Sequence, residues 1–540
     1  MTTPDFFPWA GGFAQQIKRL RSGSTVHQFE LLFSQWILPW RLAQQDEGPH
    51  SRNRLWNLRL VFWTFLWQVA QTGSSCREAI RQARALCINC GKQPPSDEGS
   101  PYCQARGALP VDRLQEIHDG LCTEARTGLA SKDLWCGREV FVADGSSLTA
   151  PDTPANQKAF PQQSAQRPGC GFPIIRLVAL LSLATGMLTA WATGCWSQHE
   201  VLLLQSLWDH LRAGDVLLAD RGFCNWALLA QCLQRKIDAV FRVKGSVRRD
   251  FRRGKRLSRH ERLVQWRKPL QAARTVSPQL WALLPEVLEL RLVRCQIAIA
   301  GFRTRQVILV TTLLDSQKYP PQALSELYYR RWAMELSLRN IKTTLQMDQL
   351  SCKNPQNLDR EIRMHFLVHN LVRRLMLEAA RRHRVPLARI SFAGTLSAAR
   401  RFGEALLQTR SKRKRARLME ELFCVLAADL VPERPGRREP RAVKRRPKPY
   451  PRLMNHRHRF LEISHQNRYY LNSKFGPKYR KSRGANQPPF RSDSRTFMVP
   501  EVHHVIPGVR HINSQRSCHP RIHFPSNPNV TYLDAPHCRF

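Results

Sequence analysis

The chain has 540 residues, of which 42% are hydrophobic, enough for two or three domains with a large core and typical of a globular protein. Its 85 Lys and Arg residues stand against 41 Asp and Glu, a formal net charge of +44. This excess far exceeds what solubility requires and indicates a polyanionic partner, with nucleic acid the first candidate and an acidic membrane surface the second.

The chain start and the cysteines predict a cytoplasmic protein. Residues 1–6 contain no basic stretch followed by an apolar core, so we expect no secretory signal. The 15 cysteines are an odd number without a repeating frame, which favours a reducing compartment over a disulfide scaffold. Cys87-x2-Cys90 could form half of a zinc site, but there is no second C-x2-C, and we interpret these residues as core or isolated cysteines.

Apolar residues recur at helical spacing through residues 26–45, 55–71 and 76–85, which predicts an N-terminal helical domain over residues 1–130. A Pro/Gly/Ser-rich loop then precedes the run Tyr102-Cys103-Gln104-Ala105-Arg106, which opens a further helical stretch. A helical block of this kind can bind DNA or act as a structural cap, and the residues alone leave both open.

From residue 138 the pattern changes to short apolar strands. Residues 140–144 predict a strand that ends in Asp144, and residues 172–184 and 187–193 predict two more. The apolar run 174–196 is long enough to raise the question of a membrane span. Because Arg176 interrupts it and Thr185-Gly186 suits a hairpin turn, we expect two buried strands.

A helix over residues 200–211, a strand that ends in Asp220, a helix over 226–235 and a strand over 240–243 complete this part of the core, residues 138–243. An α/β ribonuclease H-like fold has its elements in this order: three strands, a helix, a strand, a helix and a strand. The first and fourth strands are neighbours there, so Asp144 and Asp220 would converge. Alternatively, Asp144 caps a local turn and Asp220 pairs with Arg221.

Residues 244–318 predict a β-rich insertion with a strongly basic first part, and residues 319–385 the second part of the core. Trp266 lies in the basic part, where it could stack on an unpaired base or pack in the core.

Residues 328–342 predict one helix. At about 100° per residue its polar side chains Tyr328, Arg331, Glu335 and Lys342 share one arc. An apolar stripe beside that arc would dock the helix on a core, and it consists of Leu327, Met334, Leu338, Ile341 and Leu345.

Residues 386–452 predict a basic, helical C-terminal region with the run Lys412-Arg413-Lys414-Arg415. Residues 453–540 show no sustained periodicity, and we expect a poorly ordered tail.

The spacing Y-x2-R-x3-E-x6-K, matched by Tyr328, Arg331, Glu335 and Lys342, resembles the signature helix of the insertion sequence 4 family of DDE transposases. The resemblance covers residues 100–450 and includes Asp144-Gly-Ser and Ala-Asp220-Arg-Gly. It implies a ribonuclease H-like core that performs cut-and-paste transposition through a DNA hairpin intermediate.

The resemblance also implies roles for the site residues. Asp144, Asp220 and Glu335 would hold two Mg²⁺ ions, for which Mn²⁺ can substitute, because clustered carboxylate oxygens suit these hard cations. Phosphates of the DNA would be contacted by Tyr328, Arg331 and Lys342. Trp266 is the candidate for receiving a flipped base.

The implied partners are double-stranded DNA, at transposon ends and at the target, and a second copy of the chain, so that each core works on the DNA end held by its partner. The N-terminal domain would bind the ends, and residues 386–452 are a candidate dimerisation region. We expect a cytoplasmic, nucleoid-associated protein without a membrane partner. The alternatives are a ribonuclease H-like DNA nuclease and a DNA-binding relative that has lost catalysis.

Overall fold

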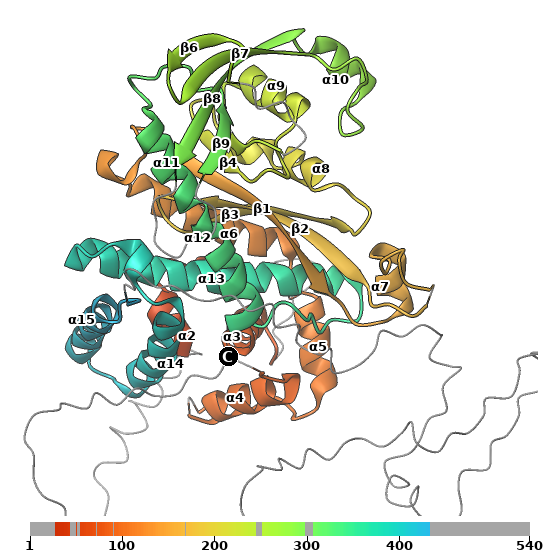
Figure 1. Cartoon of the computed structure of the whole chain (residues 1–540). Helices are drawn as coiled ribbons and strands as arrows, with labels where there is room; N and C mark the ends of the chain where they lie inside the picture. The colour runs from red at the N-terminus through yellow and green to blue at the C-terminus, as the bar shows by residue number, and fades with distance from the viewer. Residues whose placement is uncertain are drawn as a thin grey trace, which may run out of the picture. The chain divides into compact units, whose positions relative to one another are not determined.

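The computed structural model (Figure 1) describes residues 28–432, with gaps at 44–49, 51–54, 72, 90, 168, 245–250 and 297–305. All described residues belong to one compact unit, Met1–Leu461. Cys90 and the expected 453–540 tail lie outside the described residues.

The described strands form one mixed nine-stranded sheet in the order β3-β2-β1-β4-β5-β9-β8-β7-β6. The strands are β1 (Val140–Thr149), β2 (Ile174–Ser182), β3 (Leu188–Cys195), β4 (Val216–Ala219), β5 (Asp238–Arg242), β6 (Lys255–Ser258), β7 (Glu261–Arg267), β8 (Val287–Gln296) and β9 (Gln306–Thr311). β4 pairs in parallel with β1 and β5, and the other pairs are antiparallel. The strands of the expected insertion therefore extend the same sheet, because β9 pairs with β5.

The predicted adjacency of the first and fourth strands is confirmed, since β1 and β4 pair from Val140↔Val216 to Ala143↔Ala219. The apolar run 174–196 forms the two strands β2 and β3, as expected, and the chain turns between them at Gly186 with φ +69°. No helix among the described residues is long and apolar enough to cross a membrane.

Alternation along the central strands separates two hydrophobic cores. Val142 and Leu218 belong to a core shared with the N-terminal and C-terminal helices, whereas Phe141 and Leu217 belong to a core on the other face of the sheet. Because side chains alternate along a strand, Asp144 follows Val142 and Asp220 follows Leu218 onto the first face.

Helices cover both faces of the sheet (Figure 1). On the first face lie α2 (Gln28–Phe33), η1 (Pro39–Leu42), α3 (Leu58–Ala70), α4 (Cys76–Asn89), α5 (Gly99–Gly107), α6 (Val111–Thr127), α11 (Pro321–Arg330), α12 (Trp332–Arg339), η4 (Asn340–Thr344), α13 (Pro355–His383), α14 (Phe392–Gln408) and α15 (Lys412–Ala428). The second core includes α8 (Glu200–Gln205), η3 (Trp208–His210), α9 (Trp226–Gln234) and α10 (Pro278–Leu283). Short helices in connections are η2 (Ser131–Asp133), α7 (Pro154–Ala159) and η5 (Leu387–Arg389).

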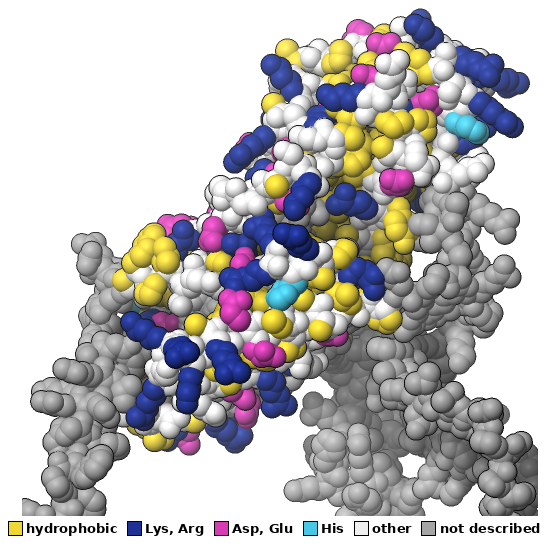
Figure 2. Space-filling model, turned by 90° about the vertical axis from the view of Figure 1, so that its left-hand side faces the viewer, with side chains coloured by type: hydrophobic (Ala, Val, Ile, Leu, Met, Phe, Trp, Pro, Cys, Tyr) yellow, Lys and Arg dark blue, Asp and Glu magenta, His cyan; other side chains and the backbone are white. Residues whose placement is uncertain are grey.

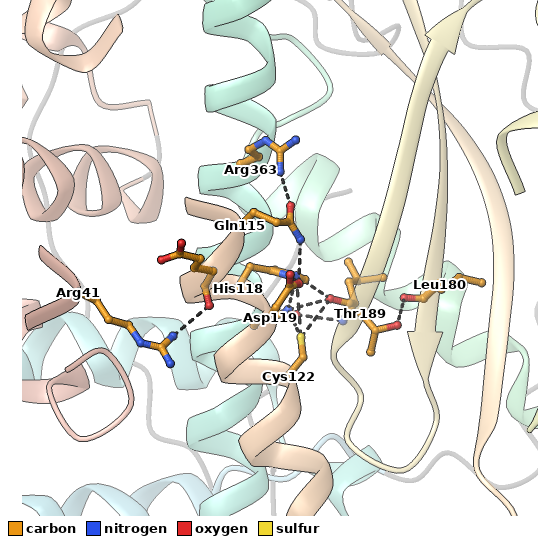
Figure 3. A network of polar contacts seen from close by, with 11 residues as sticks. Arg41, Gln115, His118, Asp119, Cys122, Leu180, Thr189 and Arg363 are labelled. Atoms are coloured by element: carbon orange, nitrogen blue, oxygen red, sulfur yellow. Dashed lines mark hydrogen bonds and ion pairs between the residues drawn. The ribbon is translucent and has the colours of Figure 1, made fainter. Parts of the chain in front are cut away.

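A buried polar network joins α6 to the sheet and to α13 (Figure 3). His118 Nε2 on α6 lies 2.9 Å from the Leu188 carbonyl of β3, and Asn370 on α13 donates to the same carbonyl at 2.8 Å. Trp191 of β3 stacks on Phe366 of α13 with ring centroids 4.3 Å apart. The N-terminal helices are thus packed against the sheet-bearing part of the chain.

The Tyr102–Arg106 run serves this packing. Tyr102 is fully buried and donates to Gln68 of α3 at 2.8 Å, and Arg106 reaches Cys352 Sγ, just before α13, at 3.3 Å. Only Cys103 and Gln104 of the run are exposed. Tyr102 and Arg106 therefore hold helices together and do not face solvent.

Candidate active site

Asp144 lies in the middle of β1, not at the end of a strand as the sequence suggested. The strand continues to Thr149, and Gly145, Ser146 and Ser147 pair with β2, so Asp144 does not cap a local turn. Gly145 allows the Glu200 side chain to lie close to β1, because a Cβ at this position would stand 2.6 Å from the carboxyl carbon of Glu200 in its present position.

Asp220 directly follows β4 and accepts a hydrogen bond from the Gly222 amide at 2.6 Å. Ala143 and Ala219 are Cα partners in the β1–β4 ladder, so Asp144 and Asp220 are the next residues of two neighbouring parallel strands. Neighbouring strands lie about 4.8 Å apart, so the two carboxylates share one small area of the sheet face.

The predicted single helix over residues 328–342 is wrong in detail. The chain forms α11 and α12, which meet at Arg331, and a π-helical turn, η4, which contains Lys342. At the junction the Arg331 amide donates a hydrogen bond to the Tyr328 carbonyl, and the Met334 amide donates one to the Arg331 carbonyl. These hydrogen bonds join residues three apart, whereas those of an α-helix join residues four apart. The expected apolar stripe is confirmed as buried: Leu327, Met334, Leu338, Ile341 and Leu345 are at most 7% exposed.

Arg331 joins the helix to the strand carboxylates. Its Nη2 lies 2.5 Å from Glu335 Oε1, and its Nη1 lies 3.7 Å from Asp144 Oδ2. The side chains of Arg331 and Asp144 are 15% and 21% exposed, so this contact is largely shielded from water. One guanidinium therefore bridges Asp144 and Glu335.

Asp144 carries the perturbed carboxyl group of the site. Its pKa is raised from 3.8 to about 6, mainly by burial and to a smaller extent by the charges of Asp220 and Glu335, against the lowering effects of the Gly145 amide and Arg331. A carboxyl group whose pKa is raised by burial beside other carboxylates is typical of a functional site, and a bound cation would stabilise its charged form.

Tyr328 and Lys342 border the carboxylates. Tyr328 is 7% exposed, with the Arg331 guanidinium 5.7 Å from its ring centre, and burial raises the pKa of its hydroxyl despite the charges of Arg331 and Arg242. Lys342 Nζ donates to the Ser147 carbonyl of β1 at 3.0 Å. The structure therefore gathers Tyr328, Arg331, Glu335 and Lys342 beside β1.

Trp266 lies apart from this cluster. It is on β7, and β4, β5, β9 and β8 separate that strand from β1 in the sheet. The ring is partly buried against the second core, and the Trp266 carbonyl accepts from Trp226 Nε1 at 3.0 Å.

The donor set at the site suits Mg²⁺ or Mn²⁺, since Asp144, Asp220 and Glu335 offer carboxylate oxygens only. No group of three His, Cys, Asp or Glu side chains is drawn together as a metal cage among the described residues. The Arg331 guanidinium instead holds two of the three carboxylates.

The chain as a whole is basic, with a formal net charge of +44. Lys and Arg side chains lie across the face of the molecule drawn in Figure 2. A surface of this kind attracts a polyanion over long distances and accounts for its affinity more than for its sequence preference.

Sequence reasoning missed two groups at the site, the Ser147 carbonyl and the Gly222 amide, and one behind it, the Glu200 carboxylate next to Gly145. The first two are backbone groups, for which side-chain identity carries no signal. Glu200 lies 56 positions from Asp144 and on the other face of the sheet, so only the folded chain relates them.

Comparisons with known proteins find similarity to transposases. Residues 135–371 match the family described as Transposase DDE domain. The transposase InsG for insertion sequence element IS4 of Escherichia coli (strain K12) is 27% identical over 323 residues, which are 59% of this chain and 70% of that protein. A cryo-EM structure of a piggyBac transposase synaptic complex with hairpin DNA is 11% identical, covers 75% of this chain and 86% of that chain, and has a TM-score of 0.36, from which we infer nothing. Residues 135–371 are thus similar to the transposase DDE domain family, and 59% of the chain is similar to an insertion sequence 4 transposase.

Proposed function

We propose that this transposase cuts an insertion sequence out of double-stranded DNA and joins it to a target, through hydrolysis and transesterification at the element's ends. The observation that carries the proposal is the position of Asp144 and Asp220, side by side on β1 and after β4, on the face where Arg331 holds Glu335. The strand order β3-β2-β1-β4-β5 supports a ribonuclease H-like core.

Asp144, Asp220 and Glu335 are the groups that would hold two Mg²⁺ ions, or Mn²⁺ in their place. A metal ion bound there would lower the pKa of the attacking hydroxyl group and would neutralise the negative charge on the leaving 3′ oxygen. The raised pKa of Asp144 fits this role, because a cation would stabilise the charged form of a carboxyl group that is buried beside two others.

The cations of the site hold the DNA backbone. Arg331 offers a planar fork to a phosphate next to the scissile bond, and Lys342 a point charge. Both now contact protein oxygens, Arg331 two carboxylates and Lys342 the Ser147 carbonyl, so DNA binding exchanges these partners for phosphates. The Tyr328 hydroxyl donates to a phosphate oxygen from beside Arg331.

The remaining parts are assigned by the family resemblance. A hairpin forms at each end and is reopened before strand transfer, with Trp266 receiving a flipped base. The active unit is a dimer in which each core works on the DNA end held by its partner. Residues 1–130 contact the ends, residues 386–452 contribute to the dimer, and the protein works at the bacterial nucleoid.

The test uses the full chain and DNA that carries the inverted repeats flanking its gene. Wild type should cleave at the repeat boundary in Mg²⁺ and stop when the metal is chelated. Asp144→Asn, Asp220→Asn and Glu335→Gln should each lower cleavage at least about 1,000-fold, while binding in chelator stays within about threefold, because they remove ligands and not phosphate contacts. Undiminished cleavage by any of the three would refute the site.

Strand transfer separates a transposase from a ribonuclease H-like nuclease. A pre-cut end with a free 3′ hydroxyl should join to plasmid DNA in the presence of wild type. Cleavage without joining would favour the nuclease, and binding without cleavage would favour a relative that has lost catalysis.

A further inference from the structure

Behind the signature helix lies a buried arginine that forms no ion pair with the described part of the chain. Arg373 is on α13, is 9% exposed, and donates from Nη2 to Ser337 Oγ of α12 at 3.0 Å. Ser337 is fully buried and lies two residues after Glu335. Two residues turn an α-helix by about 200°, so Arg373 contacts α12 on the side opposite to Glu335.

The surroundings of Arg373 fix its guanidinium in place. The group lies 5.8 Å from the ring centre of Phe392 at the start of α14, and Nη1 lies against Gly186 in the β2–β3 turn. Arg373 therefore connects α12 to α13, to α14 and to a turn of the sheet.

This arrangement is costly to the fold. Burial lowers the pKa of Arg373 to about 10, and its Nε has no hydrogen-bond partner among the described residues. Arg374, the next residue on α13, is equally buried and forms an ion pair with Glu124 of α6 at 2.9 Å, although its Nε and Nη1 also lack hydrogen-bond partners among the described residues. A core position chosen for stability alone would favour an apolar residue, because an incompletely satisfied buried cation is destabilising.

We propose that Arg373 is a positioning residue for DNA strand cleavage, which through Ser337 fixes the rotation of α12 and so the direction in which Glu335 faces Asp144 and Asp220. Arg331 and Lys342 tie the helix to β1 from the front, and Arg373 holds it from behind. A small rotation of α12 would move Glu335 by about 1 Å, enough to slow a reaction up to about 100-fold. The inference rests on the proposed cleavage chemistry.

The test compares Ser337→Ala, Arg373→Met and their double variant with Arg374→Met in the full chain. Single-turnover cleavage of end DNA should fall about tenfold or more in Ser337→Ala and Arg373→Met, with the Kd for the DNA in chelator unchanged within about twofold. The double variant should be no slower than the slower single one, because both remove the same contact. Arg374→Met should lower the melting temperature without changing the rate of the folded protein.

A second readout does not depend on turnover. Mn²⁺ binding, followed by the electron paramagnetic resonance signal of the free ion, should weaken in Ser337→Ala and Arg373→Met and stay at the wild-type level in Arg374→Met. If Ser337→Ala cleaves DNA and binds Mn²⁺ at the wild-type level, the inference is overturned, because this variant removes only the hydroxyl group that accepts the hydrogen bond from Arg373. If wild type does not cleave end DNA while its Mn²⁺ binding still depends on Ser337, the proposed function fails and the positioning role stands.

Discussion

Arg291 and Arg331 are both shielded arginines that contact carboxylates, but their guanidinium groups are satisfied to different degrees. Arg291 is fully buried on β8, where it pairs with Glu261 of β7 and donates to the carbonyls of Leu313, Asp315 and Tyr319 at 3.3, 3.2 and 2.8 Å. Arg331 bridges Asp144 and Glu335, and its Nε has no partner among the described residues.

We call Arg291 a fixed joint, because all its contacts are internal and are retained. Arg331 instead belongs to a site whose contacts can be exchanged. Every contact of Arg291 is internal and holds the segment that leads into α11 against the β7–β8 hairpin, so a second arrangement would leave buried groups unpaired. Arg331 keeps an unused donor and contacts carboxylates that repel one another. In the proposed function, DNA and metal would replace those contacts at little cost.

Removing the partner of Arg291 should have the largest effect on stability. Glu261→Gln leaves a buried cation uncompensated and should cost about 3–5 kcal/mol in the free energy of unfolding, measured by thermal or denaturant unfolding. Glu286→Gln is the control in the same hairpin, because Glu286 is 81% exposed beside Lys268 and its loss should change stability little. Equal effects of the two variants would contradict the view of Arg291 as a fixed joint.

Arg331→Ala should spare the fold and impair the reaction. We expect cleavage of end DNA to fall about 100-fold, and the slope of log affinity against log salt to decrease by about one. Arg330→Ala removes the same charge from the neighbouring, exposed residue and should change the salt slope alone. A melting temperature lowered by Arg331→Ala as much as by Glu261→Gln would remove the distinction between the two arginines.

The sequence predicted most elements of the central sheet, because they are dictated by local patterns. The strands that carry Asp144 and Asp220 are short apolar runs between turn residues, and the adjacency of β1 and β4 follows from the element order. The extension of β1 to Thr149 was missed because Gly145, Ser146 and Ser147 favour a turn locally, and pairing with β2 overrides that preference.

The finer geometry of the site depends on contacts between distant residues. The break of the signature helix at Arg331 is not visible in its helical periodicity, and the hydrogen bond of Lys342 to the Ser147 carbonyl spans 195 positions. Arg373 had a sequence signal that was not used. It shares one face of α13 with His365 and His369, at spacings of four, and all three are buried.

The smallest effect expected is a gain of stability at the site itself. The folded-state pKa of Asp144, about 6, lies above the ordinary value of 3.8, so its contribution to stability is complete below about pH 4 and is lost as the pH rises through 6. In chelator at pH 8, Asp144→Asn should therefore raise the free energy of unfolding by about 1–2 kcal/mol, and the gain should shrink towards zero as the pH falls to 4. Melting temperatures of wild type and variant across that range measure it. If the stability gained by Asp144→Asn does not vary with pH, or if the variant is less stable than wild type at pH 8, then Arg331 already balances the charges of the carboxylates. The contrast between Arg331 and Arg291 would then rest on the effect of Arg331→Ala on cleavage alone.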